Sequence, residues 1–363
     1  MVVVTRGHGK LRWHNLSAAG PAVGSAFKKG CVRMAQRVTM NDVARAAGVS
    51  SATVSYVLSG KRPVTAETRR SVEAAIDRLG FSLNPVARSL RTGRSVMVAL
   101  VVPDIANPFY ALLARSIQDE LRGRGYHVVV SNTGAQRGEE EALLQEALHQ
   151  RFAGVVMTPF RLATDAFEAI RGAGIPVVVS ADTPFGDVDL VTPDAEGAVV
   201  DAMTHLAASG RRSVGVIAGP RDATGGDPRL GRITAHAAAL GLRVRPEHIV
   251  HGEHTREAGA EGFEKLMLSP HRPEAVMCVN DMTAVGAMDA AERLGLDIPG
   301  DIALLGHDDI DIAALVRPRL STIRYPAREV GVAAAHLLLE QIDGRTKPRT
   351  VRVAAHFVSR ASS

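Results

Sequence analysis

Small polar side chains that could reach the bases of DNA recur at helical spacing between residues 38 and 59. Thr39 and Ser50 each suit the N-cap of a short helix, and Asp42 follows Thr39 at the capping-box position. Gly48 suits the end of the first helix. The apolar residues of each of these two helices lie on one face. The helix after Ser50 must therefore turn its other side chains outwards: Ser51, Ala52, Ser55, Tyr56 and Ser59. A helix with such a face can enter the major groove and contact base edges.

Residues 42–58 follow the pattern D-V-A-x-x-A-G-V-S-x-x-T-V-S-x-V-L. This dense pattern resembles the helix-turn-helix of the lactose/galactose-repressor (LacI/GalR) family, and the alternative is a helical hairpin of an unrelated protein. The resemblance implies that bases in the major groove are contacted by Ser51, Ala52 and Tyr56, with Tyr56 contributing most to discrimination. It also implies contacts to the DNA backbone for the other polar residues of the segment, which are Thr39, Ser50, Thr53 and Ser55.

A third helix completes an all-α headpiece, which we place at residues 36–82. Thr65 can cap this helix and Gly80 can end it. Its apolar residues repeat at helical spacing, and the stripe consists of Val72, Ala75, Ile76 and Leu79. Because helices this short cannot make a core alone, the three are expected to share one.

Residues 83–94 follow the headpiece directly, as a hinge helix and linker. Asn84 can cap a helix of only two turns there, which is too short to be stable alone. The segment resembles the family's hinge helix, and by that resemblance Leu90 is the wedge that enters the minor groove between central base pairs. Ala87 would lie beside it and Arg91 near phosphate. The alternative is a plain linker with an incidental helical turn.

Charge is distributed unevenly along the 363 residues. The formal net charge is +5, but residues 1–94 carry +12 and residues 95–363 carry −7. A basic N-terminal part on an acidic body indicates a polyanionic partner for that part alone. Two cysteines cannot form a disulfide framework, and no apolar run is long enough to span a membrane. With no secretory signal recognised, the protein is expected in the cytoplasm, on the nucleoid.

Residues 1–33 have no sustained period and contain no acidic residue. Members of the family usually begin just before the helix-turn-helix, where Met34 stands, so we interpret the segment as an extension translated from a wrongly chosen start. The alternative is a genuine basic arm that adds non-specific attraction to phosphate. Disorder is expected in either case.

From Ser95 onwards, apolar runs that suit strands alternate with helical segments. This alternation predicts an α/β domain at residues 95–363 with parallel sheets, covered on both faces. The domain resembles the two-lobed effector domain of the family and the periplasmic sugar-binding proteins, which implies effector binding and dimerisation. The lobe boundary is expected near Thr192 and again near Ser321, with residues 328–342 returning to the first lobe.

Aromatic and polar residues follow several predicted strands, at the ends where ligands bind in such sheets. Phe109 and Tyr110 match the family's pattern P-D-x-x-N-P-F-F/Y and would face the cleft between the lobes, where a ring can stack on a sugar or a base. Asn280 and Asp308 match its N-D and G-[FY]-D-D patterns. By resemblance, they offer hydrogen bonds to the hydroxyl groups of a ligand.

Three further candidates depart from the family's pattern. Asp227 stands where a ligand-binding arginine is frequent, while Arg229 remains at a position that is more often structural. Asp182 lies one place from a common aspartate, and His254 occupies a position that frequently lines the cleft. An aspartate in place of an arginine disfavours carboxylates and phosphates, so we expect a neutral or cationic polyol-like effector, such as a sugar. The alternative is a loss of tight effector binding.

Enzyme motifs such as G-x-S-x-G or a Walker sequence are missing from their proper strand–helix setting. His248, His251 and His254 fall across a strand and its exit, so we expect no metal site, and no cofactor. The predicted function is a transcriptional regulator, usually a repressor, that binds a pseudo-palindromic operator as a homodimer or a tetramer. A small effector would act as inducer or corepressor. The competing hypothesis, a periplasmic-type binding protein, predicts a signal peptide and no basic head.

Overall fold

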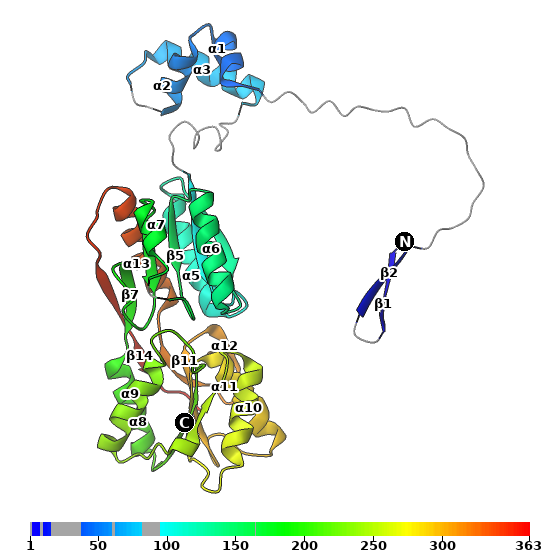
Figure 1. Cartoon of the computed structure of the whole chain (residues 1–363), viewed down its shortest axis with the longest axis vertical. Coiled ribbons are helices and arrows are strands. Elements are labelled where there is room, and N and C mark those ends of the chain that lie inside the picture. The colour runs from blue at the N-terminus through cyan, green and yellow to red at the C-terminus, as the bar shows by residue number, and fades with distance from the viewer. Residues whose placement is uncertain (1, 8–9, 16–37, 60–61, 82–94, 164) are drawn as a thin grey trace, which may run out of the picture. The chain divides into compact units, whose positions relative to one another are not determined.

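The computed structural model describes the following residues: 2–7, 10–15, 38–59, 62–81, 95–163 and 165–363. The chain divides into two compact units, Met1–Leu83 and Asn84–Ser363 (Figure 1). The predicted hinge residues Asn84, Ala87, Leu90 and Arg91 lie outside the described residues, so their roles stay predictions. No helix within the described ranges is long and apolar enough to cross a membrane.

Three helices form the headpiece: α1 (Met40–Ala47), α2 (Ser51–Ser59) and α3 (Ala66–Leu79). As predicted, α1 and α3 each end at a glycine in the left-handed region, Gly48 with φ 68° and Gly80 with φ 60°. The helices share one small core, whose buried side chains come from all three: Val43, Ala44, Val54, Val57, Val72 and Ala75.

Hydrogen bonds from side chains fix where each headpiece helix begins. The predicted capping box is present, since the hydroxyl of Thr39 accepts from the backbone N–H of Asp42 and the carboxylate of Asp42 accepts from the backbone N–H of Thr39. Ser50 and Thr65 accept in the same way at the starts of α2 and α3, at 3.1 and 3.2 Å. All three N-termini therefore lie where the sequence predicts them.

We expect Thr39→Ala to lower the free energy of unfolding of the headpiece by about 1 kcal/mol, because the N–H of Asp42 then loses its capping partner. Amide hydrogen exchange across α1 in the full chain measures this loss. Thr39→Ser keeps the hydroxyl and should retain most of the protection. An equal loss in both variants would show that the cap is not the cause.

Two strands within residues 1–33, β1 (Val2–Gly7) and β2 (Lys10–Asn15), pair antiparallel. This differs from the disorder expected there, and the physical reason is a run of β-branched residues at positions 2–5, which favours extended backbone. Residues 16–37 lie outside the described ranges. Whether the segment is a basic arm or a mis-annotated extension stays a matter of prediction.

The first lobe of the second unit holds a parallel sheet, six-stranded in the described part of the chain, in the order β13-β7-β6-β5-β3-β4. Its strands are β3 (Met97–Val102), β4 (His127–Asn132), β5 (Gly154–Met157), β6 (Val177–Ser180), β7 (Asp189–Asp194) and β13 (Thr350–Ala354). Its helices are α5 (Pro108–Arg122), α6 (Arg137–His149), α7 (Glu168–Gly172) and α13 (Ala327–Ile342). α5 and α13 cover one face of the sheet, and α6 and α7 cover the other.

The second lobe holds a similar sheet, in the order β14-β12-β11-β10-β8-β9, in which β14 pairs antiparallel. Its strands are β8 (Val214–Ala218), β9 (Ile249–His251), β10 (Ala275–Cys278), β11 (Ala303–Asp308), β12 (Ser321–Arg324) and β14 (His356–Val358). Its helices are α8 (Glu196–Ala208), α9 (Pro228–Ala237), α10 (Arg256–Met267), α11 (Asp281–Arg293) and α12 (Asp311–Leu315), with short 3₁₀ turns at Ala238–Leu240 and Pro246–His248.

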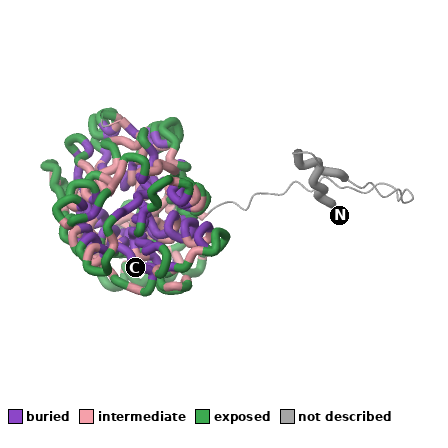
Figure 2. Tube along the Cα trace, turned by 90° about the horizontal axis from the view of Figure 1, so that it is seen from below, coloured by how far each residue is buried: buried purple, intermediate pink, exposed green. Residues whose placement is uncertain are grey.

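Within the described residues, the chain crosses between the lobes three times: from β7 to α8, from β12 to α13 and from β13 to β14. The first two crossings agree with the predicted boundaries near Thr192 and Ser321. Helix α13 returns to the first lobe as predicted, beside strands β5 and β7 (Figure 1). The third crossing is not predicted by the sequence pattern. Figure 2 shows buried residues gathered inside this unit and exposed residues on its outer loops and helix faces.

Helices α10 and α11 approach so closely that their backbones touch. A Cβ atom at Gly286 would lie 1.8 Å from the carbonyl oxygen of Arg256, and one at Gly259 would lie 2.0 Å from that of Thr283. Only glycine leaves room for this crossing. Because α10 follows the loop that carries His254, and α11 begins directly after Asn280, the crossing sets how these two loops lie in the second lobe.

Candidate functional site

A cavity of about 130 Å³ lies between the two lobes, at the carboxyl ends of strands from both sheets. At about 30 Å³ for each water of the liquid, this volume corresponds to roughly four water molecules, which is the size of a small polyol. All the residues predicted from the sequence for effector binding line it: Phe109, Tyr110, Asp182, Asp227, His254, Asn280 and Asp308. The loops that the strand-end argument selects therefore meet at one cavity, and effector binding by these residues stays a prediction.

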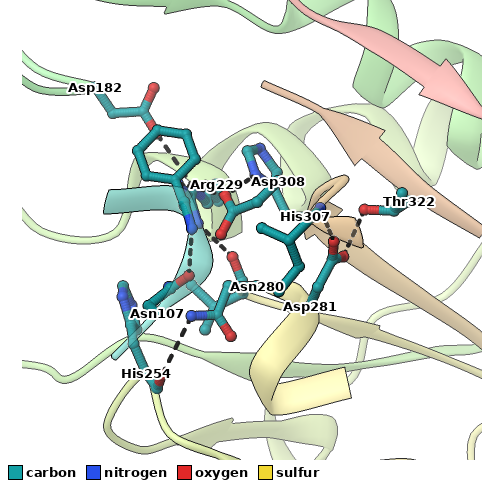
Figure 3. Close-up of polar contacts among 12 residues, drawn as sticks. Asn107, Asp182, Arg229, His254, Asn280, Asp281, His307, Asp308 and Thr322 are labelled. Atoms are coloured by element: carbon teal, nitrogen blue, oxygen red, sulfur yellow. Dashed lines mark hydrogen bonds and ion pairs between the residues drawn. The ribbon is translucent and has the colours of Figure 1, made fainter. Parts of the chain in front are cut away.

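Arg229 occupies the centre of the polar contacts (Figure 3). Its Nε donates to Asp182 at 3.4 Å, Nη2 lies 3.7 Å from the carboxylate of Asp308, and Nη1 donates to the carbonyl of Val279. Burial lowers the pKa of the guanidinium, but the aspartates around it outweigh that effect and raise it. Arg229 is therefore a fixed positive charge at the centre of the site. Its partners are all groups of the protein, which agrees with the structural role expected for this position, and the structure adds that the side chain also lines the cavity.

The sequence predicts that Asp227 faces the ligand, but its carboxylate is bonded to the backbone of its own lobe. One carboxylate oxygen accepts from the backbone N–H groups of Arg229 and Leu230, at 3.0 and 3.1 Å, and caps α9. The other accepts from the N–H of Gly219 at 2.8 Å. Since three backbone donors occupy this carboxylate, Asp227 positions Arg229 more than it offers charge to a ligand.

Asn280 is also held by the protein itself. Its side-chain oxygen accepts from the N–H of Thr283 at 2.8 Å and caps α11, while its Nδ2 donates to the carbonyl of His254 at 3.2 Å. The residue is 1% exposed. It therefore joins two loops at the floor of the cavity, and its amide has little capacity left for a ligand.

The buried Asp281, which sequence reasoning passes over, fixes the loop that carries Asp308. Its carboxylate accepts from the N–H of Ile310 at 2.9 Å and from the hydroxyl of Thr322 at 2.6 Å. Burial, and next the nearby charge of Asp308, raise the pKa of Asp281 well above its usual range. Asp308 itself has a φ of 111°, a conformation that a non-glycine residue adopts only when its surroundings hold it.

One wall of the cavity is aromatic. The rings of Phe109 and Tyr325 stack with centroids 5.4 Å apart, and Tyr110 meets Phe109 edge to face at 5.3 Å. The hydroxyls of Tyr325 and Thr158 are buried; that of Thr158 has no hydrogen-bond partner among the described residues, and that of Tyr325 lies near the side chain of Ser180. Buried hydroxyls without partners are rare, so Thr158 marks a place where a ligand can donate or accept. Applying the strand-end rule to β5 would have found Thr158, whereas Tyr325 follows β12, which the apolar pattern does not mark.

His254 contributes a neutral ring. Its pKa is lowered to about 4, mainly by burial and next by the positive charge of Arg229. The ring meets Phe160 edge to face, with centroids 4.7 Å apart. Because the imidazole stays uncharged near neutral pH, the charged side chains that line the cavity are Arg229 and three aspartates.

The lowered pKa of His254 predicts a stability loss in mild acid. The unfolded chain takes up this proton near pH 6.5, whereas the folded chain resists it until about pH 4. Above about pH 6.5, His254 is neutral in both states and does not lower the free energy of unfolding. As the pH drops towards 4, protonation favours the unfolded chain, and the free energy of unfolding falls by up to about 3 kcal/mol. Denaturant unfolding between pH 7 and pH 4 should show a shallower decline for His254→Gln than for the wild type. Identical declines would contradict the assignment.

Arg161, which the sequence analysis does not single out, joins the lobes beside the cavity. Its side chain is 12% exposed and donates to Asp222 at 2.8 Å and to Glu253 at 2.7 Å, both in the second lobe. Within its own lobe, Glu140 accepts from the backbone N–H groups of Phe160 and Arg161, at 2.6 and 2.9 Å. We call Arg161, Asp222 and Glu253 the clasp.

Breaking the clasp should weaken the binding of any ligand that contacts both lobes. Arg161→Ala removes two charge-assisted bonds between the lobes, so we expect about a tenfold weaker effector affinity and a larger radius of gyration in small-angle X-ray scattering. Arg171→Ala breaks a pair with Asp187 at 2.8 Å that stays within the first lobe, and serves as the control. Equal behaviour of the two variants would argue against a role in closure.

In the headpiece, the predicted DNA-contacting residues lie on or beside the outer face of α2. Ser51 and Ala52 are exposed, and Tyr56 is half-buried. The guanidinium of Arg62 lies 5.2 Å from the centre of the Tyr56 ring, a cation–π arrangement that limits the rotamers of Tyr56. Sequence reasoning does not identify Arg62, because its loop position carries no periodic signal.

Family models and relatives of known function match most of the chain. A model of the bacterial regulatory proteins of the lacI family matches residues 39–84, and a model of the periplasmic binding protein-like domain matches residues 203–363. The chain is 33% identical to the HTH-type transcriptional repressor CytR of Escherichia coli (strain K12), over 85% of this chain and 90% of that protein. The chain belongs to the lacI family.

Solved structures agree with this lacI-family assignment. The complex of the transcriptional regulator CelR with cellobiose is 28% identical, covers 90% of this chain and 100% of that one, and has a TM-score of 0.68. A lac repressor dimer bound to operator and the anti-inducer ONPF covers 90% and 99%, with a TM-score of 0.80; at 24% identity it shows the same fold. The predicted class, a helix-turn-helix transcriptional regulator and not an enzyme, is confirmed by these relatives.

Proposed function

We propose that this lacI-family regulator is a repressor that works in the cytoplasm, on the nucleoid, as a homodimer. Two headpieces would bind the half-sites of a pseudo-palindromic operator, with α2 in the major groove. The hinge residues would meet at the centre, where Leu90 enters the minor groove. Support comes from the exposed polar face of α2 and from the CytR repressor and the operator-bound lac repressor, which this chain resembles.

We infer that the effector is an uncharged, hydroxyl-rich molecule such as a sugar. The observation that carries this is the charge of the cavity lining: Arg229 is already paired with Asp182 and Asp308, and Asp227 adds a third carboxylate. A phosphate or carboxylate would meet an excess of negative charge there. The unpaired hydroxyl of Thr158 and the aromatic wall suit a polyol, whose hydroxyls form hydrogen bonds and whose C–H face stacks on rings.

An operator selection tests the DNA-binding part. Purified protein is mixed with random duplex DNA at about 0.15 M salt, and the bound pool is sequenced. We expect a palindrome with a flexible central step; Leu90→Ala should weaken its centre and Tyr56→Ala its half-sites. Binding that depends on salt but on no sequence would overturn the proposal of a specific repressor.

Calorimetry with the same protein tests the effector class. The panel should pair neutral sugars with their phosphates and with the matching sugar acids. We expect heat only from neutral members, and a change in operator affinity on adding them, in either direction, since the sign is open. Binding of the phosphates alone would overturn the inference about the effector and leave the operator proposal standing.

A further inference from the structure

One hydrogen bond joins the two helices of the helix-turn-helix on their exposed side. Ser51, the first residue of α2, donates from its hydroxyl to the side-chain oxygen of Asn41, in the first turn of α1, at 2.7 Å. Both residues are exposed, and neither contributes to the headpiece core. The bond therefore orders two polar side chains at the surface that the proposed function turns towards DNA.

This bond decides which partner can donate a hydrogen bond to a third group and which can only accept one. A serine hydroxyl has one hydrogen, and Ser51 gives it to Asn41, so its oxygen can only accept from a third group. The oxygen of Asn41 receives that hydrogen, so its Nδ2 remains the outward donor with two N–H bonds. Together, the two side chains offer one acceptor and one donor.

We propose that Asn41 is a specificity-determining residue that, through Ser51, makes the repressor select adenine at one position of each half-site. The inference rests on the proposed function, which places α2 in the major groove. Adenine presents an N6 amino donor next to an N7 acceptor, the complement of the Ser51–Asn41 pair. Guanine presents two acceptors and faces the oxygen of Ser51 with O6, and thymine presents an acceptor and a methyl group. Cytosine satisfies Ser51 alone.

Substitution of Asn41 separates this mechanism from a general contribution to affinity. In Asn41→Ala, the Ser51 hydroxyl turns freely and can donate as well as accept. The adenine preference at that position should therefore fall about tenfold, with guanine and thymine gaining, while the other positions keep theirs. In Asn41→Asp, the acceptor of Ser51 remains but the donor is lost, so cytosine should replace adenine.

The test is operator selection with the full-length wild type, Asn41→Ala, Asn41→Asp and Ser51→Ala. Because the paired residues act as one unit, the double variant of Asn41 and Ser51 should be no less selective than either single variant. Glu73→Ala, at an exposed position of α3, is the control for expression and folding.

The outcomes are distinguishable. A wild-type palindrome with one adenine position that relaxes only in the Asn41 and Ser51 variants supports the inference. A palindrome that is the same in Asn41→Ala, or that weakens uniformly at every base, overturns it and leaves the proposed repressor intact. If the wild type itself selects no palindrome, the proposed function fails first.

Discussion

Replacing Arg229 with methionine should abolish measurable effector binding, with an affinity loss of at least about a hundredfold, and should destabilise the fold. The side chain is 20% exposed and meets Asp182 and Asp308 from opposite lobes. Without it, Asp308 keeps its desolvation penalty and loses its arginine, Asp182 keeps only Arg232 as a counter-charge, and the carbonyl of Val279 loses its donor. Breaking such a pair costs about 3–5 kcal/mol.

Arg232 provides a matched control for this experiment. It contacts Asp182 at 3.5 Å from the same helix, α9, but does not line the cavity. Arg232→Met should therefore change effector affinity only a few-fold. Arg229→Lys keeps the charge but not the fork of donors, so its binding should lie between the two. Calorimetry measures the effector affinity, and denaturant unfolding measures the free energy of unfolding. Equal losses of affinity in the two methionine variants would refute the central role of Arg229.

Gly286→Ala should be among the most damaging single-methyl additions in the chain. Its Cβ would lie 1.8 Å from the carbonyl oxygen of Arg256 and 2.9 Å from the backbone nitrogen of Ala260. These are backbone atoms of α10, so no side-chain rotation can relieve the overlap and the two helices must separate. We expect a loss of about 3 kcal/mol or more in the free energy of unfolding. The loops of His254 and Asn280 would shift apart, so effector affinity should fall as well.

Gly197→Ala is the control for Gly286→Ala. This glycine lies exposed on α8, and an added Cβ would meet no atom within 4 Å. There the same methyl group should stabilise the helix by about 0.5–1 kcal/mol, because alanine loses less backbone freedom on folding. Thermal unfolding of the two variants measures the contrast. A mild effect at Gly286 would show that α10 and α11 can move apart easily.

Local chemistry explains why the headpiece is predicted well. The caps of Thr39, Ser50 and Thr65 depend on residues three positions away, and such short-range bonds are legible in a sequence. Strand β7 and the strands after residue 320 are missed because polar residues or proline interrupt the apolar pattern. Their pairing is decided by the sheet they join, which lies far away in the chain.

In the candidate site, too, the features set by local sequence are predicted and those set by long-range contacts are not. Which loops meet in the cavity follows from the strand-end rule, so Phe109, Tyr110 and Asp308 are found. Which partner each charged group takes depends on the closure of two lobes, and no spacing in the sequence encodes this. Arg229 and Arg161 are therefore missed, although both bond across the cleft.

The three crossings between the lobes also determine the order in which the parts can be completed during synthesis. The second lobe is nearly contiguous, from α8 to β12, whereas the first lobe begins at β3 and needs α13 and β13 from the end of the chain. A nascent chain arrested before residue 327 therefore carries the headpiece and most of the second lobe, while β5, β6 and β7 lack the helix α13 that packs against them. Because domains fold as units while the ribosome advances, the lobe that starts first finishes last. Effector sensing can arise only once the whole chain has been made.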